Sequence, residues 1–301
     1  MVRAGVEAVN WHHPNYPPRL KEIADPPPVL YFKGTLLPSD ERSVAVVGTR
    51  GPTSYGREAA AALSADLARN GITIVSGLAR GIDGIAHRAA MDNGGRSIAV
   101  LGSGLDIVYP REHAGLFQQI QAQGAVASEY PLGVRPDARN FPRRNRLISG
   151  MSLGTLVVEA SDSSGARWTV RHALDQDREV FCVPGSIFSP VSRFTNRMIQ
   201  EGAKLVSSYT DVLEELNFTV VAHQVEMALT PERDDEAEAA LLHYLDEEPL
   251  HIDDIRRSAS LPISAVSSLL SVLELKGKVK QVGCIHYIRI RETVATYGNF
   301  L

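Results

Sequence analysis

The sequence predicts a doubly wound, mostly parallel α/β sheet followed by a small winged-helix domain. Short apolar runs recur along the chain, and each is followed by a glycine- or serine-rich turn and then by a helical pattern. The runs are continuous, which is typical of strands that helices cover on both faces. The chain then ends in a pattern of three helices and a hairpin. With 301 residues, of which 44% are hydrophobic, it can bury a sizeable core without disulfides or metals.

Residues 1–42 are predicted to form an extended, proline-rich lead-in that packs on the core. Six prolines precede a short apolar stretch at 29–32. Because proline removes a backbone donor and breaks helices, this segment cannot hold a long helix.

The doubly wound domain is predicted at 43–217. Its strands are expected at 44–47, 72–75, 98–101, 125–127, 156–158, 180–183 and 204–206. Parallel strands need crossover connections, and the intervening segments suit helices, for example at 55–69 and 165–174.

A polar linker is predicted at 218–235 and the winged-helix domain at 236–301. The domain's helices are expected at 237–245, 252–259 and 263–275, with a turn at 261–262 and two strands around Gly283. Its presumed recognition helix, 263–274, has no Arg, Lys, Asn or Gln for base edges, and from residue 235 onward ten acids face seven Lys and Arg. We therefore expect a protein-contact or regulatory role rather than operator binding.

Composition excludes several classes of protein. Lys and Arg number 31 against 35 Asp and Glu, a net charge of −4, so any anion site must be local. No apolar run is long enough for a membrane span, and the N-terminal residues do not form a signal peptide. Cys182 and Cys284 have no nearby CxxC, so we expect reduced thiols and no metal site. The sequence predicts a cytoplasmic protein without a membrane partner.

Three predicted strands run directly into glycine-rich turns, at 48–51, 76–81 and 102–106. In a parallel sheet these turns gather at the edge where strands end and helices begin, where free backbone N–H groups favour phosphates. The turns therefore predict a phosphate-binding rim, with tight packing as the alternative interpretation.

The usual nucleotide signatures are incomplete. No GxGxxG turn is intact, no acid follows the second strand to accept a ribose hydroxyl, and no GxxxxGK[ST] occurs. We expect no nucleotide cofactor.

An arginine cluster follows the fourth predicted strand. Its members are Arg135, Arg139, Arg143, Arg144 and Arg146, interleaved with Phe141 and Asn145. Guanidinium forks bind phosphates and an aromatic ring stacks on bases, which is how proteins hold single strands. The alternative is a salt-bridged helix start in which Arg144 and Arg146 tether acids.

Other polar residues near the turns are interpreted as structural. Asp83 and His87 stand four apart on a helix and are expected to hold the second turn in shape, since no nucleophile elbow accompanies them. Glu129 and Glu159 end strands and are expected to brace the arginines. Trp168 is expected in the core or between helices.

Seven motifs together resemble one family. They are GTR at 48–50, SGLARGIDGIAHRAA at 76–90, AVLGSGLDIVYPREH at 99–113, SEYPLG at 128–133, FPRRNRLISGMS at 141–152, VVEASDSSGA at 157–166 and VFCVPG at 180–185. The chain thereby resembles the DprA/Smf family, the DNA-processing proteins of natural transformation, over nearly all of residues 11–216. The resemblance implies an extended Rossmann fold that binds and protects single-stranded DNA, forms a homodimer and helps load the RecA recombinase, without known catalysis.

The resemblance also assigns residues. Arg50 matches the family's DNA-contacting arginine, Arg111 stands where a basic residue assists, and Phe141 matches the aromatic position before the RNR motif. The full predicted DNA-binding set is Gly48, Thr49, Arg50, Ser76, Gly77, Arg80, Gly81, Ser103, Gly104, Arg111, Arg139, Phe141, Arg143, Arg144, Asn145, Arg146, Ser164 and Gly165. Two features depart from the family: a lysine that some members carry just before the aromatic is absent, and the chain starts almost directly at the lead-in, without the helical domain of many members.

Two other functions stay open at this point. The chain is also similar to Rossmann-type phosphoribohydrolases, which cleave nucleoside monophosphates with a PGGxGTxxE turn, but only GTLVVE at 154–159 survives. A winged-helix transcriptional regulator is the third possibility, which the acidic C-terminal segment disfavours.

Overall fold

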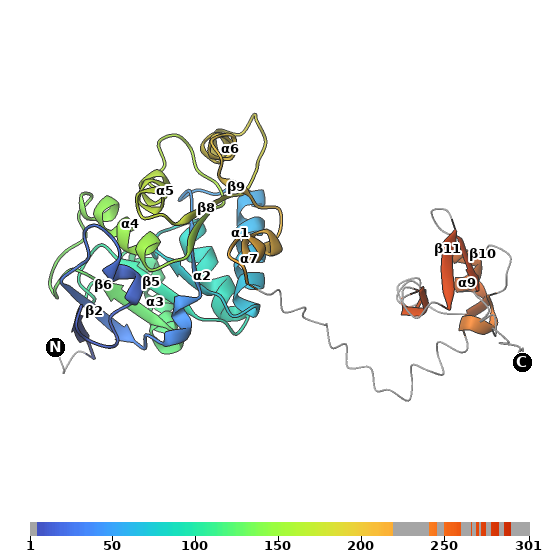
Figure 1. Cartoon of the computed structure of the whole chain (residues 1–301), viewed down its shortest axis with the longest axis horizontal. Coiled ribbons are helices and arrows are strands. Elements are labelled where there is room, and N and C mark those ends of the chain that lie inside the picture. Colours follow the sequence, from blue (N-terminus) through green and yellow to red (C-terminus); the bar gives the residue numbers. More distant parts are fainter. Residues whose placement is uncertain are drawn as a thin grey trace, which may run out of the picture. The chain divides into compact units, whose positions relative to one another are not determined.

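The computed structural model contains two compact units, residues 1–221 and 222–301 (Figure 1). The structure describes residues 5–218, 241–245, 250–259, 266, 269–270, 272–274, 278–282 and 286–289. The predicted linker beyond residue 218, the turn at 261–262 and Gly283 lie outside the described residues.

A nine-stranded sheet forms the centre of the first unit. Its strands are β1 (Glu7–Asn10), β2 (Val29–Gly34), β3 (Ser43–Val47), β4 (Thr73–Ser76), β5 (Ser97–Leu101), β6 (Ala125–Ser128), β7 (Gly154–Val157), β8 (Glu179–Cys182) and β9 (Lys204–Leu205). They lie in the order β1-β2-β6-β5-β4-β3-β7-β8-β9. Strands β3 to β9 pair in parallel, whereas β2 pairs antiparallel with both of its neighbours, β1 and β6. The predicted mostly parallel sheet is confirmed, with all seven expected strands in place.

The lead-in contributes more than the sequence predicts. Its apolar stretch is strand β2, which pairs with β6 so that Tyr31 lies opposite Ser128. Leu30 and Phe32 point into the core, and β1 then pairs with the outer edge of β2. The segment that was expected only to pack on the core therefore extends the sheet by two strands.

Helices cover both faces of the sheet. They are α1 (Ser54–Arg69), α2 (Ile82–Asp92), α3 (Ala114–Gln123), α4 (Asn140–Gly150), α5 (Ala166–Asp175), α6 (Arg193–Gln200) and α7 (Tyr209–Glu215). Helices α4, α5 and α6 share one buried apolar cluster with the lead-in, whereas α1, α2 and α7 share another. Helix α3 adds a third cluster with part of α2. Residues Val44–Val46 of β3 are fully buried, which explains why that strand is continuously apolar.

The winding of the sheet changes direction at β3. From β3 the chain proceeds outward through β4, β5 and β6, and it then returns to the other side of β3 to form β7, β8 and β9. The loops that follow β3 and β7 therefore lead to helices on opposite faces of the sheet. Open α/β sheets bind their ligands in the crevice at such a point.

The second unit carries a small antiparallel sheet. Strands β10 (Leu250–His251), β11 (Val279–Val282) and β12 (His286–Arg289) lie in the order β10-β12-β11 beside helix α9 (Ile252–Ala259). Leu241, Ile255, Leu270 and Leu273 are buried in its core. The predicted helices at 237–245 and 263–275 lie partly outside the described residues, and their described residues at 241–243, 266, 269–270 and 272–274 are helical.

Candidate nucleic-acid interface

A groove of about 650 Å³ opens where the winding changes direction. The turn after β3, the loop after β7 and the starts of α4 and α5 form its walls. Eight residues of the predicted DNA-binding set line it: Gly48, Thr49, Arg50, Phe141, Arg144, Asn145, Ser164 and Gly165. The structure thus brings together residues from three segments that are far apart in the sequence: 48–50, 141–145 and 164–165.

The turn after β3 is held from both sides. The Thr49 backbone N–H donates to the carbonyl of Glu159 at 2.6 Å, and the Thr49 carbonyl accepts from Ile82 at 3.2 Å. Gly81 has a φ of +76°, and a Cβ there would collide with the carbonyl of Thr49 and with Arg50. Glycine is therefore required at 81 for the second turn to press against the first.

The second turn, at 76–81, is closed rather than open to a ligand. The carboxylate of Asp83 accepts from the N–H groups of Gly77 at 3.1 Å and Ala79 at 3.4 Å, while His87 Nε2 accepts from Leu78 at 3.3 Å. The prediction that Asp83 and His87 hold this turn is confirmed. The same bonds correct another expectation, because the amides that were assigned to phosphate are already used.

Asp83 and His87 are buried, and this changes their titration. Burial lowers the pKa of His87 from 6.5 to about 3. Burial also raises the pKa of Asp83, while the nearby Arg144 charge and the two backbone N–H groups oppose that rise. His87 is therefore neutral at physiological pH and can accept the Leu78 hydrogen bond.

The third turn, at 102–106, also lies inside the structure. Ser103 is buried and donates to the carbonyl of Ile107, and the Gly104 N–H donates to Val134. Neither residue lines the groove. The predicted rim of three turns is thus wrong in part: the first turn lines the groove with Gly48, Thr49 and Arg50, whereas the second turn contributes only Ala79. Tight packing explains Ser76, Gly77, Ser103 and Gly104.

Arg144 of α4 is buried, with 4% of its surface exposed. Its guanidinium donates to the carbonyls of Gly77 and Val100, and its Nε donates to Asn145. Burial lowers its pKa to about 10. The interpretation of Arg144 as an exposed phosphate fork was wrong, because the side chain joins α4 to β4 and β5.

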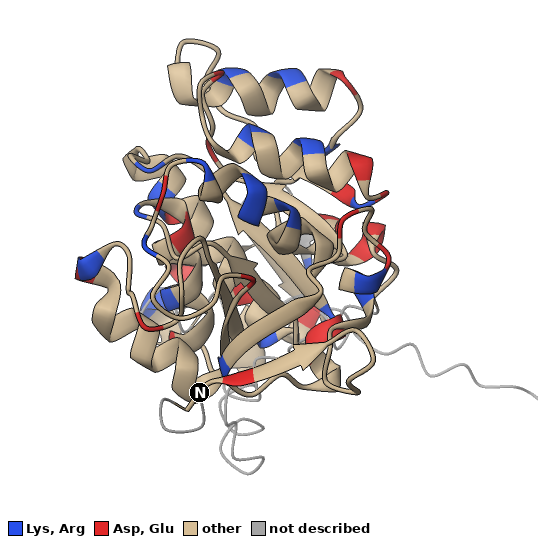
Figure 2. Ribbon diagram, turned by 90° about the vertical axis from the view of Figure 1, so that its left-hand side faces the viewer, with Lys and Arg blue, Asp and Glu red and all other residues tan. Residues whose placement is uncertain are grey.

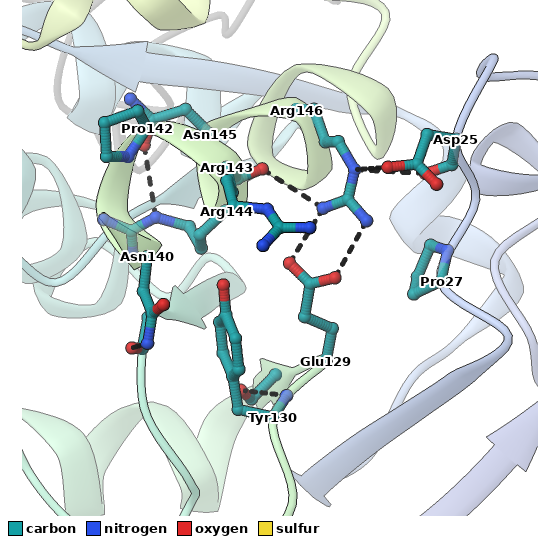
Figure 3. A network of polar contacts seen from close by, with 12 residues as sticks. Asp25, Pro27, Glu129, Tyr130, Asn140, Pro142, Arg143, Arg144, Asn145 and Arg146 are labelled. Atoms are coloured by element: carbon teal, nitrogen blue, oxygen red, sulfur yellow. Dashed lines mark hydrogen bonds and ion pairs between the residues drawn. The ribbon is translucent and has the colours of Figure 1, made fainter. Parts of the chain in front are cut away.

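Arg146 is occupied by acids (Figure 3). Two of its nitrogens contact the two oxygens of Glu129 at 2.8 Å each, and Asp25 of the lead-in lies 3.3 Å away. The expectation that Glu129 braces an arginine is confirmed, and Arg146 tethers the lead-in to α4. The alternative interpretation of the cluster as a salt-bridged helix start therefore holds for Arg146.

Four other predicted arginines lie outside the groove. Arg80 pairs with Glu112 at 2.7 Å, and Arg139 pairs with Asp137 at 3.1 Å, both on the exposed surface. Arg111 and Arg143 are exposed and have no acid partner among the described residues. Ion pairs on the surface are weak, so none of the four is locked in place.

The exposed chemistry of the groove centres on Arg50, Phe141 and Tyr109. The Arg50 guanidinium lies 5.9 Å from the centre of the Phe141 ring. The centres of the Tyr109 and Phe141 rings lie 5.6 Å apart, and the two ring planes are tilted. Arg50 is exposed and has no acid partner among the described residues. A cation beside two aromatic faces can bind a phosphate and stack a base at the same place.

Asn145 and the serine loop complete the wall. The Asn145 side-chain amide donates to the carbonyl of Gly165 at 3.3 Å, which ties α4 to the start of α5. Ser161, Ser163 and Ser164 line the groove beside this contact. Hydroxyls in such a loop can donate to phosphate oxygens.

One groove residue was not predicted and another was predicted wrongly. Tyr109 follows the third turn and was not singled out, while Trp168 was expected in the core or between helices but is 47% exposed and lines the groove. Helix α5 buries Ala166, Val170 and Ala173, and position 168 lies off this stripe, which was the signal available in the sequence.

Glu159 does not brace arginines as expected. Its two oxygens accept from the N–H of Thr53 at 2.9 Å and from the Thr53 hydroxyl at 2.6 Å, at the beginning of α1. Only 2% of this residue is exposed. Glu159 therefore secures the strand-to-helix turn, which its place at a strand end did not reveal.

The described residues contain neither a metal-binding group of side chains nor a membrane-spanning helix. No group of three or more His, Cys, Asp or Glu side chains is placed to hold a metal ion there. Among the same residues no helix is both long and apolar enough to cross a membrane.

Helices α4, α5 and α6 all carry arginines. Figure 2 shows these basic segments on the stacked helices in the upper part of the view. These helices border the groove or continue from it. A local basic surface thus exists in a chain whose net charge is −4.

Comparison with known families matches both units. Residues 7–217 match the family described as DNA recombination-mediator protein A, and residues 225–283 match the DprA winged helix domain. The second match supports the predicted winged helix.

Individual relatives agree with the family match. The chain is 43% identical to Protein Smf of Escherichia coli K12 over 284 residues, which covers 92% of this chain and 75% of the relative. It is 43% identical to DNA processing protein DprA of Bacillus subtilis 168 over 213 residues, or 70% of this chain and 72% of the relative.

Two solved structures share the fold of the first unit. DNA processing protein A of Streptococcus pneumoniae superposes with a TM-score of 0.67 at 42% identity, over 69% of this chain and 74% of that one. DNA processing protein A of Helicobacter pylori, described for its single-stranded DNA binding mode, superposes with a TM-score of 0.63 at 29% identity, over 70% of this chain and 95% of that one.

Proposed function

Because the chain belongs to the DNA recombination-mediator protein A family, also called DprA/Smf, we propose that it binds single-stranded DNA in the groove at the change of winding. The observation that carries this proposal is the cluster of Arg50, Phe141 and Tyr109. The relative from Helicobacter pylori is described as binding single-stranded DNA, which supports the same ligand here.

The groove suits a single strand without sequence preference. Its exposed groups are a guanidinium, aromatic faces and hydroxyls, which contact phosphates and stack on any base. We infer that Arg50, Phe141, Asn145, Ser164 and Gly165 form the principal contacts. Arg80, Arg111, Arg139 and Arg143 remain candidates for peripheral phosphate contacts.

In the cell we propose that this binding protects incoming DNA during natural transformation and helps RecA to load for recombination. The support is the family's description as recombination mediators and the resemblance of the motifs. We further propose that the protein works in the cytoplasm, where incoming strands meet the recombinase.

We propose that the first unit also forms a homodimer. Leu205 of the terminal strand β9 is 44% exposed, and Ile187 and Phe188 in the loop before α6 are 77% and 87% exposed. Exposed apolar side chains next to an open strand edge favour association with another chain.

DNA binding is favoured over the phosphoribohydrolase alternative. That alternative needs Glu159 as a catalytic carboxylate, yet both of its oxygens are engaged by Thr53 and the side chain is buried. We therefore propose a binding protein rather than an enzyme. Release of free base from a nucleoside monophosphate, abolished by Glu159→Gln, would establish the enzyme instead.

The test of the proposed function is fluorescence anisotropy with a labelled single strand, the matching duplex and a nucleotide competitor. The single strand should bind better than the duplex, the nucleotide should not displace it, and salt should weaken the complex, because phosphate contacts release counterions. Arg50→Ala should weaken binding, whereas Arg88→Ala, an exposed arginine on α2 outside the groove, should not. Equal binding of duplex and single strand would refute the proposal.

A further inference from the structure

A second groove, of about 320 Å³, lies between α5 and α6. It shares Ser163, Ser164 and Trp168 with the groove described above. The two grooves therefore adjoin at the serine loop and the first turn of α5. A ligand that leaves the first groove on this side meets Trp168 next.

Trp168 is the largest side chain at the junction. Nearly half of its surface is exposed, although a tryptophan buries more apolar area than most residues when it packs. Its neighbours on α5, Thr169 and Val170, are buried, so the helix keeps the indole on its outer side. An indole held on a helix next to a groove is a rigid stacking surface for a base.

Arginines outnumber acids in the lining of the second groove. Three arginines, Arg167, Arg171 and Arg197, line it together with a single acid, Asp175. Figure 2 shows the Arg segments of α5 and α6 one above the other. A polyanion is the ligand that fits this lining.

The ion pairs in this groove leave the arginines exchangeable. Arg171 lies 3.9 Å from Asp175, with 71% and 65% of the two side chains exposed. Arg197 contacts Asp162 at 2.8 Å and Glu201 at 3.7 Å, again with about half of each side chain exposed. Because exposed pairs of this kind contribute little, a phosphate can replace the carboxylate. Arg144, which is buried, and Arg146, which is held by Glu129 with 12% of its side chain exposed, have no such freedom.

We propose that a bound single strand continues from the first groove across Trp168 into the groove between α5 and α6. Trp168 stacks one base, and Arg167, Arg171 and Arg197 contact the phosphates that follow. The inference rests on the proposed function and extends it, since it defines the path and the length of the DNA site. A duplex cannot follow this path, because its bases are already stacked on each other.

Tryptophan fluorescence tests the stacking directly. The chain has two tryptophans, and Trp11 lines neither groove, so Trp11→Phe leaves Trp168 as the only emitter. Oligothymidine should quench this emission as it binds, and quenching should saturate together with anisotropy of a labelled strand. Trp168→Phe, which keeps only Trp11, should show no quenching.

The affinity for strands of different length provides an independent test. Trp168→Ala should weaken binding of an oligothymidine of about 16 nucleotides roughly tenfold, and leave one of about 4 nucleotides unchanged. Trp11→Ala, which removes the other half-exposed tryptophan, is the matched control and should change neither. Arg171→Ala should lower the salt dependence of the longer strand by about 0.7 in the log–log slope, the value for one phosphate contact.

The outcomes separate this inference from the function on which it rests. If Arg50-dependent binding occurs but Trp168 emission and length dependence are unaffected, the path is wrong and the first groove alone is the site. If no single strand binds, both proposals fail. If Trp168 emission instead changes on dilution without DNA, and Trp168→Ala alters the sedimentation coefficient, the groove contacts a second copy of the chain and the proposed path is overturned.

Discussion

The turn after β3 and helix α4 both place arginines beside the same groove, yet the two regions use them in opposite ways. Arg50 in the turn is exposed and lies against Phe141 without an acid partner among the described residues. Arg144 and Arg146 in α4 are enclosed by carbonyl groups and carboxylates of neighbouring segments. The charge of Arg50 is available to a ligand, whereas the charges of Arg144 and Arg146 form internal contacts that hold the walls of the groove together.

An arginine-rich motif can therefore be interpreted only when the partners of each arginine are known. The charge density of α4 is higher than that of the turn, but most of it is neutralised within the fold. An arginine becomes a ligand-binding residue only where the fold leaves it exposed and without a stronger internal partner. The predictions below test whether the two regions are as different as their contacts indicate.

The largest expected effect is on stability, at Arg144. Arg144→Ala should lower the free energy of unfolding by about 3–5 kcal/mol, because it leaves Asp83 buried without its nearby cation and two carbonyls without donors. Urea unfolding at neutral pH measures this change. Arg143→Ala, the exposed neighbour, should stay within about 0.5 kcal/mol of the natural protein. Similar free energies of unfolding for the two variants would show that Arg144 does not hold the fold together.

The next effect is on affinity, at Arg50. Arg50→Ala should reduce single-strand binding roughly tenfold to hundredfold, about 1.5–3 kcal/mol, because a charge-assisted phosphate contact is lost. Its unfolding curve should match that of the natural protein, since Arg50 is exposed and outside the internal network. A well-folded Arg50→Ala variant with normal affinity would move the site away from the turn after β3.

A smaller effect is expected on the pH dependence of stability, and it arises from His87 in the internal network. Because the folded protein binds a proton at His87 only near pH 3, whereas the unfolded chain does so near 6.5, stability should fall as pH drops through this window, by up to about 1.4 kcal/mol per pH unit. His87→Gln should make this dependence shallower by as much as one proton in urea titrations between about pH 6 and pH 4. Asp83, whose raised pKa acts in the opposite direction, is present in both proteins, so the difference isolates His87. Identical pH slopes would show that the buried imidazole is not the group that resists protonation.

The smallest effect is expected from the basic residues of the second unit. Replacing Arg256, Arg257, Lys278 and Lys280 together by Gln should change single-strand affinity less than threefold, about 0.6 kcal/mol, because their unit is acidic overall. Lys276 belongs to the same basic group but lies outside the described residues. A hundredfold loss of single-strand affinity in the anisotropy assay would show that the winged helix binds DNA. The region around Arg50 would then not be the only DNA-binding region.

Much of the candidate site could be predicted without coordinates. Arg50, Phe141 and the serine loop were found because they stand directly after strand ends or within motifs of the family, and these local signals survive folding. Asp83 and His87 were interpreted correctly for a similar reason, since a spacing of four on a helix brings both side chains to one turn.

The errors concern residues whose partners come from distant parts of the chain. Arg144 meets Gly77 and Val100, Arg146 meets Asp25, and Glu159 meets Thr53 more than a hundred positions away. Nothing in the neighbouring sequence of these residues identifies such partners. The sheet strand β2 was missed in the same way, because its pairing with β6 joins residues 31 and 128.

By itself the sequence determined seven strands of the sheet and the turns that follow them, because apolar periodicity and turn residues act over a few neighbouring positions. Its seven spaced motifs also indicated the family. Only the tertiary structure decided which arginines are exposed, that Trp168 is half-exposed and that the two grooves adjoin at it. Burial and pairing depend on contacts between segments that the strand order brings together. For that reason the charge on Arg50 stays free for a ligand, while the charge on Arg146 is held by Glu129.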